Sequence, residues 1–304
     1  MKFNQPVAIG ICTKNNADTI VDTLQSILNL DYPRELFDVI VVDGLSTDKT
    51  IDLVENALTS SGLSWRVLSD QGCGLGYARQ LIVDNTEAEF IAWVDADQCL
   101  SPSWLRIILS QLLSMPKIAA VRGAQGITRN LPLPAALENY VKNIDDTEVG
   151  VEAKAIYFAI GGSVLRKNAV IAAGGFNPLF SAVAEDTDLA ARLEQIGWQI
   201  HNSAHAIFYH KSRSTWRALF RQYRNFGQGF ATANRHHPDT FKRISTIDLI
   251  ASFLISIAVS PRYFSRIFKI SHNLAFLLLP LHHTYKLVAW LIGYLLSSDP
   301  LPRG

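Results

Sequence analysis

The chain has 304 residues and is nearly neutral, with 28 Lys+Arg against 27 Asp+Glu. This balance argues against nucleic acid as a partner, because a nucleic-acid binder presents a strongly basic field. The 3 cysteines form neither a CxxC pair nor an even-numbered framework, which favours a reducing cytosol over a disulfide scaffold. The first residues lack the apolar core and the cleavage site of a signal peptide.

The first part of the chain alternates between apolar runs typical of buried strands and amphipathic segments typical of helices. Strands are predicted at 7–12, 37–42, 65–68, 90–94 and 118–121, with a helix between each pair. This alternation predicts a parallel sheet with helices on both faces and right-handed crossovers. The loops after the first four strands would then gather at one edge of the sheet, where open α/β sheets bind ligands.

The second part is less regular. The pattern predicts a turn and strand at 159–166, helices at 168–173 and from 185, a strand at 198–209 and a basic, aromatic helix at 216–233. Residues 125–146 show no pattern that can be interpreted.

The loops after the first two strands carry polar side chains that suit a nucleotide. Thr13 and Asn15 follow the first strand and either contact a nucleotide or cap the next helix. Asp43 stands at the tip of the second strand, where its carboxylate could accept hydrogen bonds from a base or a ribose. Asp48, five residues later, is expected to cap a helix.

The loop after the third strand holds glycines at 72, 74 and 76, followed by Arg79. It is similar to a phosphate-binding glycine loop. Its G-x-G-x-G spacing is not that of a dinucleotide fingerprint, and even a full match would be a weak signal.

The fourth strand runs directly into two carboxylates, Asp95 and Asp97. Hard oxygen ligands in this position suit Mg²⁺ or Mn²⁺, which in turn bridges phosphate oxygens. A strand followed by an Asp-capped turn into a helix at Pro102 would give the same pattern. Gln98 either adds a neutral oxygen ligand or faces solvent.

Three acidic residues fall within Glu185–Asp188, where a helix is predicted to begin. Negative charge is favoured at a helix N-terminus, although one or two carboxylates would be enough. The alternative is a general base, Asp186 with Glu185 beside it, aimed at an acceptor hydroxyl. Asp188 is expected to turn away on the helix.

His210 ends an apolar strand and precedes a basic helix that carries Arg221 and Arg224. A single histidine is more often structural, but we include His210 among the candidate metal ligands. The arginines either offset the charge of a pyrophosphate leaving group or belong to a solvated or lipid-facing helix.

Acidic residues become rare after Glu194, and the rest of the chain is basic and apolar. The apolar runs 249–259, 274–281 and 287–296 are each about 8 to 11 residues long, short of the roughly 20 that cross a bilayer. We expect interfacial or re-entrant helices against an anionic membrane surface, with a soluble helical subdomain as the alternative. The sequence therefore predicts one domain at 1–235 and an apolar helical, membrane-associating region at 236–304.

Taken together, these motifs resemble the family 2 inverting glycosyltransferases of the GT-A fold, in their membrane-associated branch. The matching pieces stand in the family's order over roughly residues 5–235. They are Gly10–Asn15, Val41–Asp48, Gly76–Arg79, Asp95–Asp97, Gly161–Ser163, Ala184–Leu189 and Tyr209–Gly229. The resemblance implies an α/β fold with a Rossmann-like, mostly parallel central sheet flanked by helices, extended by C-terminal apolar helices.

The resemblance also implies a function. A single sugar would pass from a nucleoside diphosphate sugar to a hydroxyl of a membrane-bound glycan or polyprenyl-linked acceptor, at the cytoplasmic face of the cell membrane. Asp43 would contact the nucleotide base, Asp97 with Asp95 would hold the metal and diphosphate, and Asp186 would be the catalytic base. The expected donor-binding residues are Thr13, Asn15, Asp43, Arg79, Asp95, Arg221 and Arg224.

Processive members of the family carry a Q-x-x-R-W signature. The nearest segment here, Arg221–Asn225, displaces the glutamine and has no tryptophan, which favours the transfer of one sugar over polymer synthesis. Two alternatives remain. A nucleotidyltransferase would need a first loop rich in glycine and lysine, and Lys14 is thin support for it. A non-catalytic membrane partner that binds a sugar nucleotide would be free to lose the aspartates at 95, 97 and 186.

Overall fold

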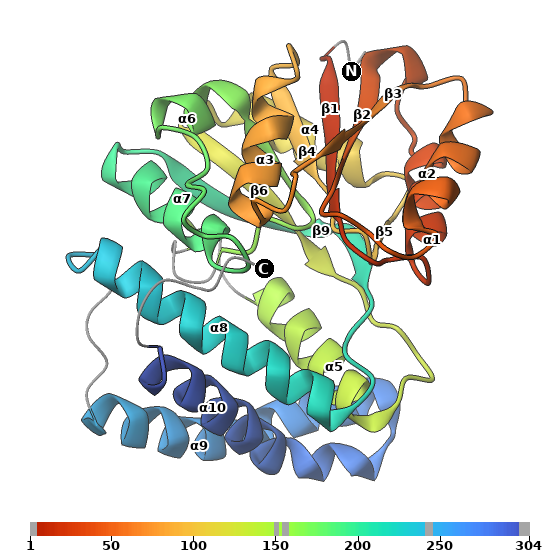
Figure 1. Ribbon diagram of the computed structural model, residues 1–304. Helices are drawn as coiled ribbons and strands as arrows, with labels where there is room; N and C mark the ends of the chain where they lie inside the picture. The colour runs from red at the N-terminus through yellow and green to blue at the C-terminus, as the bar shows by residue number, and fades with distance from the viewer. Residues whose placement is uncertain (1–4, 149–151, 154–157, 241–245, 298–304) are drawn as a thin grey trace. The chain divides into compact units, whose positions relative to one another are not determined.

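The computed structural model describes residues 5–148, 152–153, 158–240 and 246–297 (Figure 1). The chain forms two compact units. Among the described residues, the first unit contains 5–126, 146–148, 152–153 and 158–210, and the second contains 127–145, 211–240 and 246–297. The domain boundary that the sequence predicts at residue 235 stays a prediction.

The first unit begins as the predicted alternation of strands and helices. Its strands are β1 (Val7–Thr13), β2 (Phe37–Asp43), β3 (Ser64–Ser69) and β4 (Phe90–Trp93). The helices that follow them are α1 (Ile20–Leu28), α2 (Thr50–Thr59), α3 (Leu75–Asp84) and α4 (Trp104–Ser114), with a short 3-10 turn, η1 (Arg34–Leu36), before β2. The four strands pair in parallel in the order β3-β2-β1-β4, as predicted.

Beyond β4 the sheet is mixed. The further strands are β5 (Gln98–Leu100), β6 (Ile118–Gln125), β7 (Glu152–Ala153), β8 (Ser163–Arg166) and β9 (Gln199–His210). The fifth predicted strand, β6, does not continue the parallel run, because β8 lies between β4 and β6 and is antiparallel to both. In turn, β9 is parallel to β6 and antiparallel to β5 and β7. The short β5, which the sequence pattern did not reveal, becomes important at the site.

The sheet of the first unit is buried on both faces. Successive residues of a strand point to opposite sides, so Ile9 and Val41 join one apolar cluster with α1, α2 and α4, whereas Ala8 and Ile40 join another. The second cluster includes residues from α3, α6 (Lys167–Ala172) and α7 (Glu185–Gln195). Burial on both sides explains why β1, β2 and β4 appear as continuous apolar runs rather than alternating patterns.

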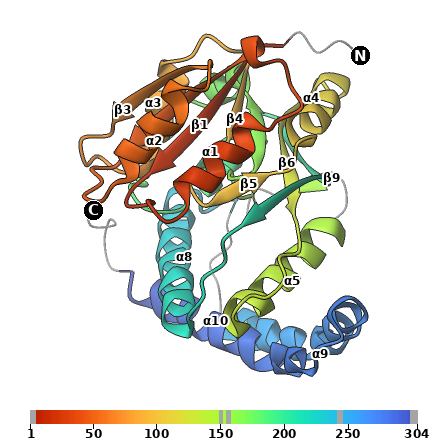
Figure 2. The same cartoon turned by 90° about the vertical axis from the view of Figure 1, so that its right-hand side faces the viewer.

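The second unit is helical (Figures 1 and 2). It contains most of α5 (Leu133–Glu148), then α8 (Trp216–His236), α9 (Thr246–Ser271), η3 (Leu274–Leu278) and α10 (Leu279–Leu295). Its core is an apolar cluster in which Tyr140 and Ile144 of α5 meet Ile267, Phe276 and Leu279. The helix α5 falls in the stretch whose sequence pattern could not be interpreted.

The structure corrects the predicted lengths of the C-terminal apolar segments. The runs at 274–281 and 287–296 are joined into one helical stretch, Leu274–Leu295, of 22 residues. Among the described residues this stretch is long and apolar enough, by length and composition, to cross a membrane. The sequence pattern separated the two runs because His282, His283 and Lys286 interrupt their apolar character.

Candidate functional site

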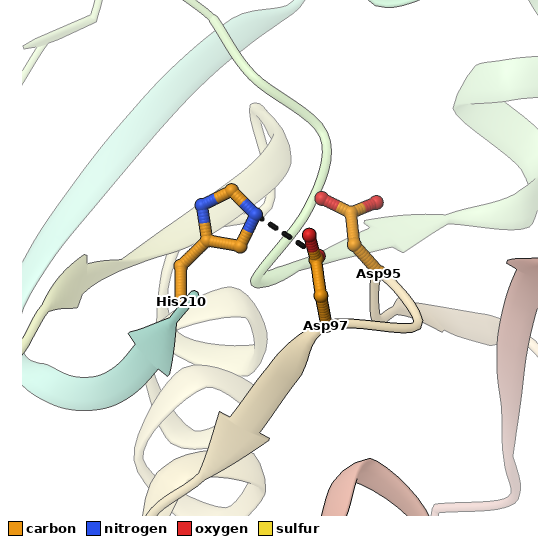
Figure 3. Close-up of side chains that lie close together, drawn as sticks. All are labelled: Asp95, Asp97 and His210. Carbon is orange, nitrogen blue, oxygen red and sulfur yellow. Dashed lines mark hydrogen bonds and ion pairs between the residues drawn. The ribbon is translucent and has the colours of Figure 1, made fainter. Parts of the chain in front are cut away.

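Three side chains that could hold a metal ion lie close together where β5 pairs with β9. Gln98 lies opposite His210 in this antiparallel pair, which brings Asp97 next to the histidine. Nε2 of His210 is 3.0 Å from Oδ1 of Asp97. One ligand atom each from Asp95, Asp97 and His210 lie within 4.8 Å of one another (Figure 3). Two carboxylates and an imidazole at this separation are a suitable donor set for a divalent cation.

Asp95 is held in place by two neighbours that the sequence did not assign clearly. Nε2 of Gln98 donates to Oδ2 of Asp95 at 3.1 Å, and the Asp95 N–H donates to Oε1 of Gln98 at 3.2 Å. Gln98 is buried, so it does not face solvent. Gly161 packs so closely that a Cβ there would lie 2.0 Å from Oδ2 of Asp95. A side chain at position 161 would therefore displace the carboxylate.

The electrostatics around Asp95 also favour a cation. Burial raises the pKa of Asp95; Arg79 opposes this shift, and the nearby Asp97 adds to it. Two acidic groups held close together gain from a bound positive charge. The residues present therefore fit a divalent metal.

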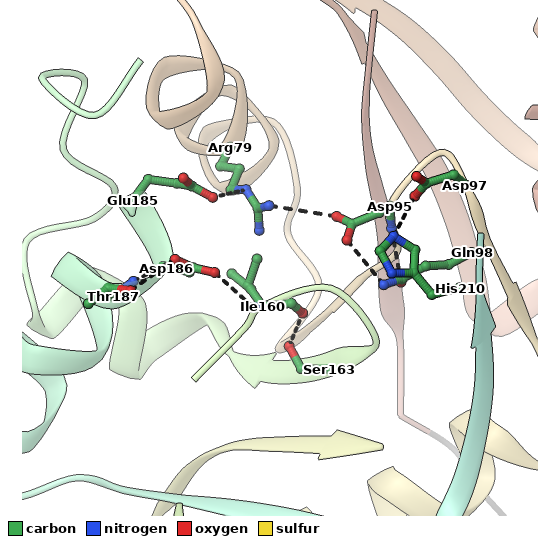
Figure 4. A network of polar contacts seen from close by, with 10 residues as sticks. All are labelled: Arg79, Asp95, Asp97, Gln98, Ile160, Ser163, Glu185, Asp186, Thr187 and His210. Carbon is green, nitrogen blue, oxygen red and sulfur yellow. Dashed lines mark hydrogen bonds and ion pairs between the residues drawn. The ribbon is translucent and has the colours of Figure 1, made fainter. Parts of the chain in front are cut away.

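Arg79 connects this group to the start of α7. It lies on α3, only 6% exposed, with Nη2 3.7 Å from Oδ1 of Asp95 and Nε 3.1 Å from Oε1 of Glu185 (Figure 4). Its guanidinium carbon is 5.6 Å from the centre of the Trp93 ring. Burial by itself would lower the pKa of Arg79, but Glu185 and Asp95 raise it overall. The guanidinium therefore stays charged.

The two adjacent acids at the start of α7 have different environments. Glu185 is 2% exposed, and burial raises its pKa to about 8 against the opposing effect of Arg79. Asp186 is half-buried. Its Oδ2 accepts from the Ile160 N–H at 3.3 Å and its Oδ1 accepts from the Thr187 N–H at 2.7 Å. Asp186 is therefore the more accessible of the two carboxylates.

The residues on either side of Glu185 and Asp186 also have distinct conformations or partners. Asp188 turns away, as predicted, and pairs with Arg192 on the same helix. The residue before the pair, Ala184, has a φ of 69°. This left-handed conformation is unusual for alanine and is typical of strained functional sites.

Polar side chains connect the loops after β1 and β2. Asn15 donates its N–H to Oγ of Ser46 at 2.9 Å, and its Oδ1 accepts from the Thr47 N–H at 2.8 Å. Asp43 accepts from the Ser46 N–H at 3.1 Å. Thr13 donates its hydroxyl to Oδ1 of Asn16 at 3.2 Å. These contacts fix both loops at the sheet edge, and the part of Thr13, Asn15 and Asp43 in donor binding stays a prediction.

The N-cap of α2 is Lys49 rather than Asp48, but Oδ1 of Asp48 accepts from the first N–H of the helix, that of Thr50, at 3.0 Å. Its Oδ2 accepts from the Ala17 N–H at 3.2 Å, so the same side chain also ties the loop after β1 to this helix.

The backbone N–H groups of the glycine loop before α3 donate to acceptors within the protein. The Leu75 N–H donates to the Ser181 carbonyl at 2.7 Å and the Gly76 N–H donates to the Phe180 carbonyl at 3.0 Å. A Cβ at Gly76 would lie 2.4 Å from the Asn177 carbonyl oxygen. The glycines therefore allow this loop to pack against residues 177–181.

Arg221 and Arg224 lie on α8, in the second compact unit. Their contribution to donor binding stays a prediction.

Comparison with known proteins identifies the family. The model of the family described as Glycosyl transferase family 2 matches residues 8–186. The chain belongs to glycosyltransferase family 2. The matched region contains β1 to β4, Arg79, the Asp95 and Asp97 pair and Asp186.

Two curated relatives of this glycosyltransferase illustrate its range. It is 31% identical over 106 residues to the poly(ribitol-phosphate) beta-N-acetylglucosaminyltransferase TarS of Staphylococcus aureus, covering 35% of this chain and 18% of TarS. It is 27% identical over 239 residues to the beta-monoglucosyldiacylglycerol synthase of a Nostoc species, covering 73% of this chain and 48% of the synthase. The chain thus spans about half or less of the length of these relatives.

Solved structures establish the fold. The mannosyltransferase PcManGT from Pyrobaculum calidifontis, in complex with GDP-Man and Mn²⁺, has a TM-score of 0.69 at 18% identity and covers 98% of this chain and 89% of PcManGT. A TarS fragment in complex with UDP-GlcNAc has a TM-score of 0.57 at 17% identity, covering 95% of this chain and 89% of the fragment. The predicted GT-A fold is confirmed.

Proposed function

We propose that this family 2 glycosyltransferase moves a single sugar, with inversion, from a nucleoside diphosphate sugar to a hydroxyl of a membrane-bound glycan or polyprenyl-linked acceptor. One observation carries the proposal: Arg79 links the Asp95, Asp97 and His210 group to the acidic start of α7. A site for the leaving group and a site for a general base would thus lie side by side. Two relatives are named as a poly(ribitol-phosphate) N-acetylglucosaminyltransferase and a monoglucosyldiacylglycerol synthase, and two structural neighbours hold UDP-GlcNAc or GDP-Man. These names support the substrate class.

Asp95, Asp97 and His210 would hold Mg²⁺ or Mn²⁺. When bound, such an ion neutralises the negative charge of the diphosphate as its bond to the sugar breaks. These three side chains suit such an ion, because one ligand atom from each of them lies within 4.8 Å of the others. The Mn²⁺ in the PcManGT complex agrees with this choice of metal.

Asp186 would take the proton of the acceptor hydroxyl. The hydroxyl oxygen would form a bond to C1 from one face of the sugar while the bond from C1 to the diphosphate oxygen breaks on the other face, which inverts C1. The two N–H groups that donate to Asp186 would hold its carboxylate in this orientation. Glu185 is buried against Arg79, so we propose that it positions that arginine rather than transferring the proton.

The remaining donor contacts follow the sequence expectation. Thr13 and Asn15 would line the nucleotide, Asp43 would contact its base, and Arg221 and Arg224 would face the pyrophosphate. The reaction would take place at the cytoplasmic face of the cell membrane. Nucleic acid has no part in it, and residues 1–235 would form the catalytic domain.

Replacement of Asp186 by asparagine tests the mechanism. Asp186→Asn keeps the shape of the side chain but cannot accept the proton, so we expect kcat to fall by about 10²–10⁴-fold with donor affinity nearly unchanged. The matched control is Glu194→Gln, an exposed acid on the same helix, which should keep its activity. Retention of more than about a tenth of kcat in Asp186→Asn would exclude Asp186 as the base.

A donor-hydrolysis assay separates this proposal from a non-catalytic binding partner. Turnover of a nucleoside diphosphate sugar with Mn²⁺ supports the transferase. The absence of any turnover, with the donor still bound, would instead favour a non-catalytic binding partner.

A further inference from the structure

The stretch Leu274–Leu295 is long and apolar enough to cross a membrane, but the middle of this stretch contacts a buried charge within the second unit. Glu138 of α5 is 1% exposed. Its carboxylate accepts from Nζ of Lys286 at 2.8 Å and from the Tyr223 hydroxyl at 2.6 Å, and Nε2 of His282 lies 3.2 Å away. If α10 crossed a bilayer, Lys286 and His282 would have to leave this carboxylate and enter hydrocarbon, which is strongly unfavourable.

Close contact between backbones also holds α10 against α8. A Cβ at Gly227 of α8 would lie 1.9 Å from the Trp290 carbonyl oxygen, and one at Gly293 of α10 would lie 1.8 Å from the Arg224 carbonyl oxygen. Glycine at both positions therefore lets the two helices touch. Figures 1 and 2 show α10 running alongside both α8 and α9, and it contacts both. The helix is part of the packed unit rather than a separate anchor.

The start of this stretch has one packed side and one open side. Phe276 and Leu279 are buried in the core of the second unit. The leucines on the open side follow a spacing of three, one and three residues, which places them on a common face. They are Leu274, Leu277, Leu278 and Leu281, exposed by 64%, 59%, 38% and 68%. We call these four residues the leucine face. Such a row of exposed large apolar residues marks an interaction surface rather than chance exposure.

The charge near the leucine face suits anionic lipid. Residues 249–298 contain no aspartate or glutamate and four basic residues, Arg262, Arg266, Lys269 and Lys286. The first three are exposed on the last turns of α9, just before the leucine face, and Lys286 is bound to Glu138. A second copy of the chain would fit less well, because a symmetric contact would bring the same positive charges together.

We propose that the leucine face inserts into the interface of an anionic bilayer, with the basic end of α9 beside lipid phosphates, so that α10 lies on the membrane without crossing it. Apolar insertion combined with basic flanking residues is how interfacial helices bind membranes. The role of this membrane binding rests on the proposed function, because an enzyme bound to the membrane can reach an acceptor bound to the same membrane.

Flotation with lipid vesicles tests the surface. The purified chain should float with vesicles of phosphatidylcholine and phosphatidylglycerol and much less with phosphatidylcholine alone. The double variant Leu277→Glu with Leu281→Glu should bind at least about tenfold more weakly, because two inserted side chains are lost. The matched control is Ile171→Glu, an equally exposed position on α6 of the first unit, which should float as well as the unchanged chain. Equal flotation of the leucine variant would overturn the proposal.

A second measurement distinguishes lying on the membrane from crossing it. Membranes from cells that express the chain are washed with alkaline carbonate, which releases interfacial proteins and leaves spanning ones behind. Release supports the proposal, whereas resistance to the wash overturns it in favour of a span. A chain that does not float, and whose dimer in solution is dissociated by the leucine variant, would instead show a face for self-association and also overturn it.

These outcomes are independent of the proposed reaction. The leucine variant should have the same thermal unfolding midpoint as the unchanged chain. It should also hydrolyse a soluble donor at the same rate, because it alters neither the group of Asp95, Asp97 and His210 nor the start of α7. Full activity without membrane binding by the unchanged chain would refute only the surface. Membrane binding with full activity in Asp186→Asn would refute only the mechanism.

Discussion

The two compact units each bury a group of charges, but the groups are neutralised to different degrees. In the first unit a single buried arginine, Arg79, faces both Asp95 and Glu185, and burial raises the pKa of each of these carboxyls. In the second unit a single carboxylate, Glu138, is surrounded by donors from three helices. Although burial alone would raise the pKa of Glu138, Lys286 and Lys142 with hydrogen bonds from His282 and Lys286 hold it well below its usual range.

The degree to which buried charges are paired distinguishes a binding site from a structural network. A network whose carboxylate is fully paired needs no further ligand and fixes the packing of its helices. A buried group with more carboxylates than cations is not neutralised within the protein, so a bound cation would stabilise it. By this criterion we expect the Glu138 network to be structural, and we propose that the group of Asp95, Asp97 and His210 is functional.

The largest expected effect is on the structural network. Glu138→Ala removes the acceptor for Tyr223, His282 and Lys286 at once, and it should destabilise the second unit by about 3–5 kcal/mol, as breaking a buried ion pair does. Hydrogen exchange of the α10 amides and urea unfolding would measure it. The control is Lys142→Ala, whose more exposed amino group lies 3.5 Å from Glu138 and should cost less than about 1 kcal/mol. Equal effects of the two variants would contradict the central place of Glu138.

The next largest effect is expected in the group of Asp95, Asp97 and His210. Asp97→Ala should weaken Mn²⁺-dependent donor binding by about 100-fold, because a metal contributes several kcal/mol of charge stabilisation. Thermal shift with a donor screen measures it, since a ligand that binds the folded state raises its stability. If donor affinity were the same with Mn²⁺ and with EDTA, the group would not hold a metal.

A smaller effect is expected at the link between the two acidic groups. Arg79→Lys keeps the charge but cannot reach Asp95 and Glu185 together, so kcat should fall about tenfold while the KM for the donor changes little. Steady-state kinetics with Mn²⁺ separate the two parameters. A rise in KM with unchanged kcat would show instead that Arg79 binds the donor directly.

The most diagnostic prediction is that the stability of the two units should depend on pH in opposite directions. Burial raises the pKa of Glu185 to about 8, so its contribution to stability is present below about pH 4.5 and is lost as pH rises through about 8. The pKa of Glu138 is lowered, so its contribution is present above about 4.5 and is lost as pH falls further.

Hydrogen exchange resolved by segment, without divalent metal, would detect these slopes in α7 and in α5 separately. Glu185→Gln and Glu138→Gln are the matched controls, and each should flatten the slope of its own unit alone. Parallel slopes in both units would remove the distinction between the two charge groups.

Much of the fold and the identity of the candidate residues could be predicted from local patterns. The apolar runs of β1, β2 and β4 and the acids that follow them are visible in the sequence, because strands buried on both faces leave continuous apolar stretches. The family motifs then supplied the GT-A fold. The pattern failed for β5, which has three residues, and for α5, whose polar and apolar residues gave no clear periodicity.

The α/β class, the family and the acidic residues at the strand and helix ends depend on short stretches of chain, so they could be predicted without the fold. Three contacts between distant segments became visible only in the folded chain: β8 separates β4 from β6, β5 brings Asp97 to His210 across 113 residues, and Arg79 joins Asp95 to Glu185. The same is true of the contact of Lys286 and His282 with Glu138. The physical reason is that a short segment can pair with many distant partners at similar local cost. The choice among them is made by the burial and charge of the whole unit.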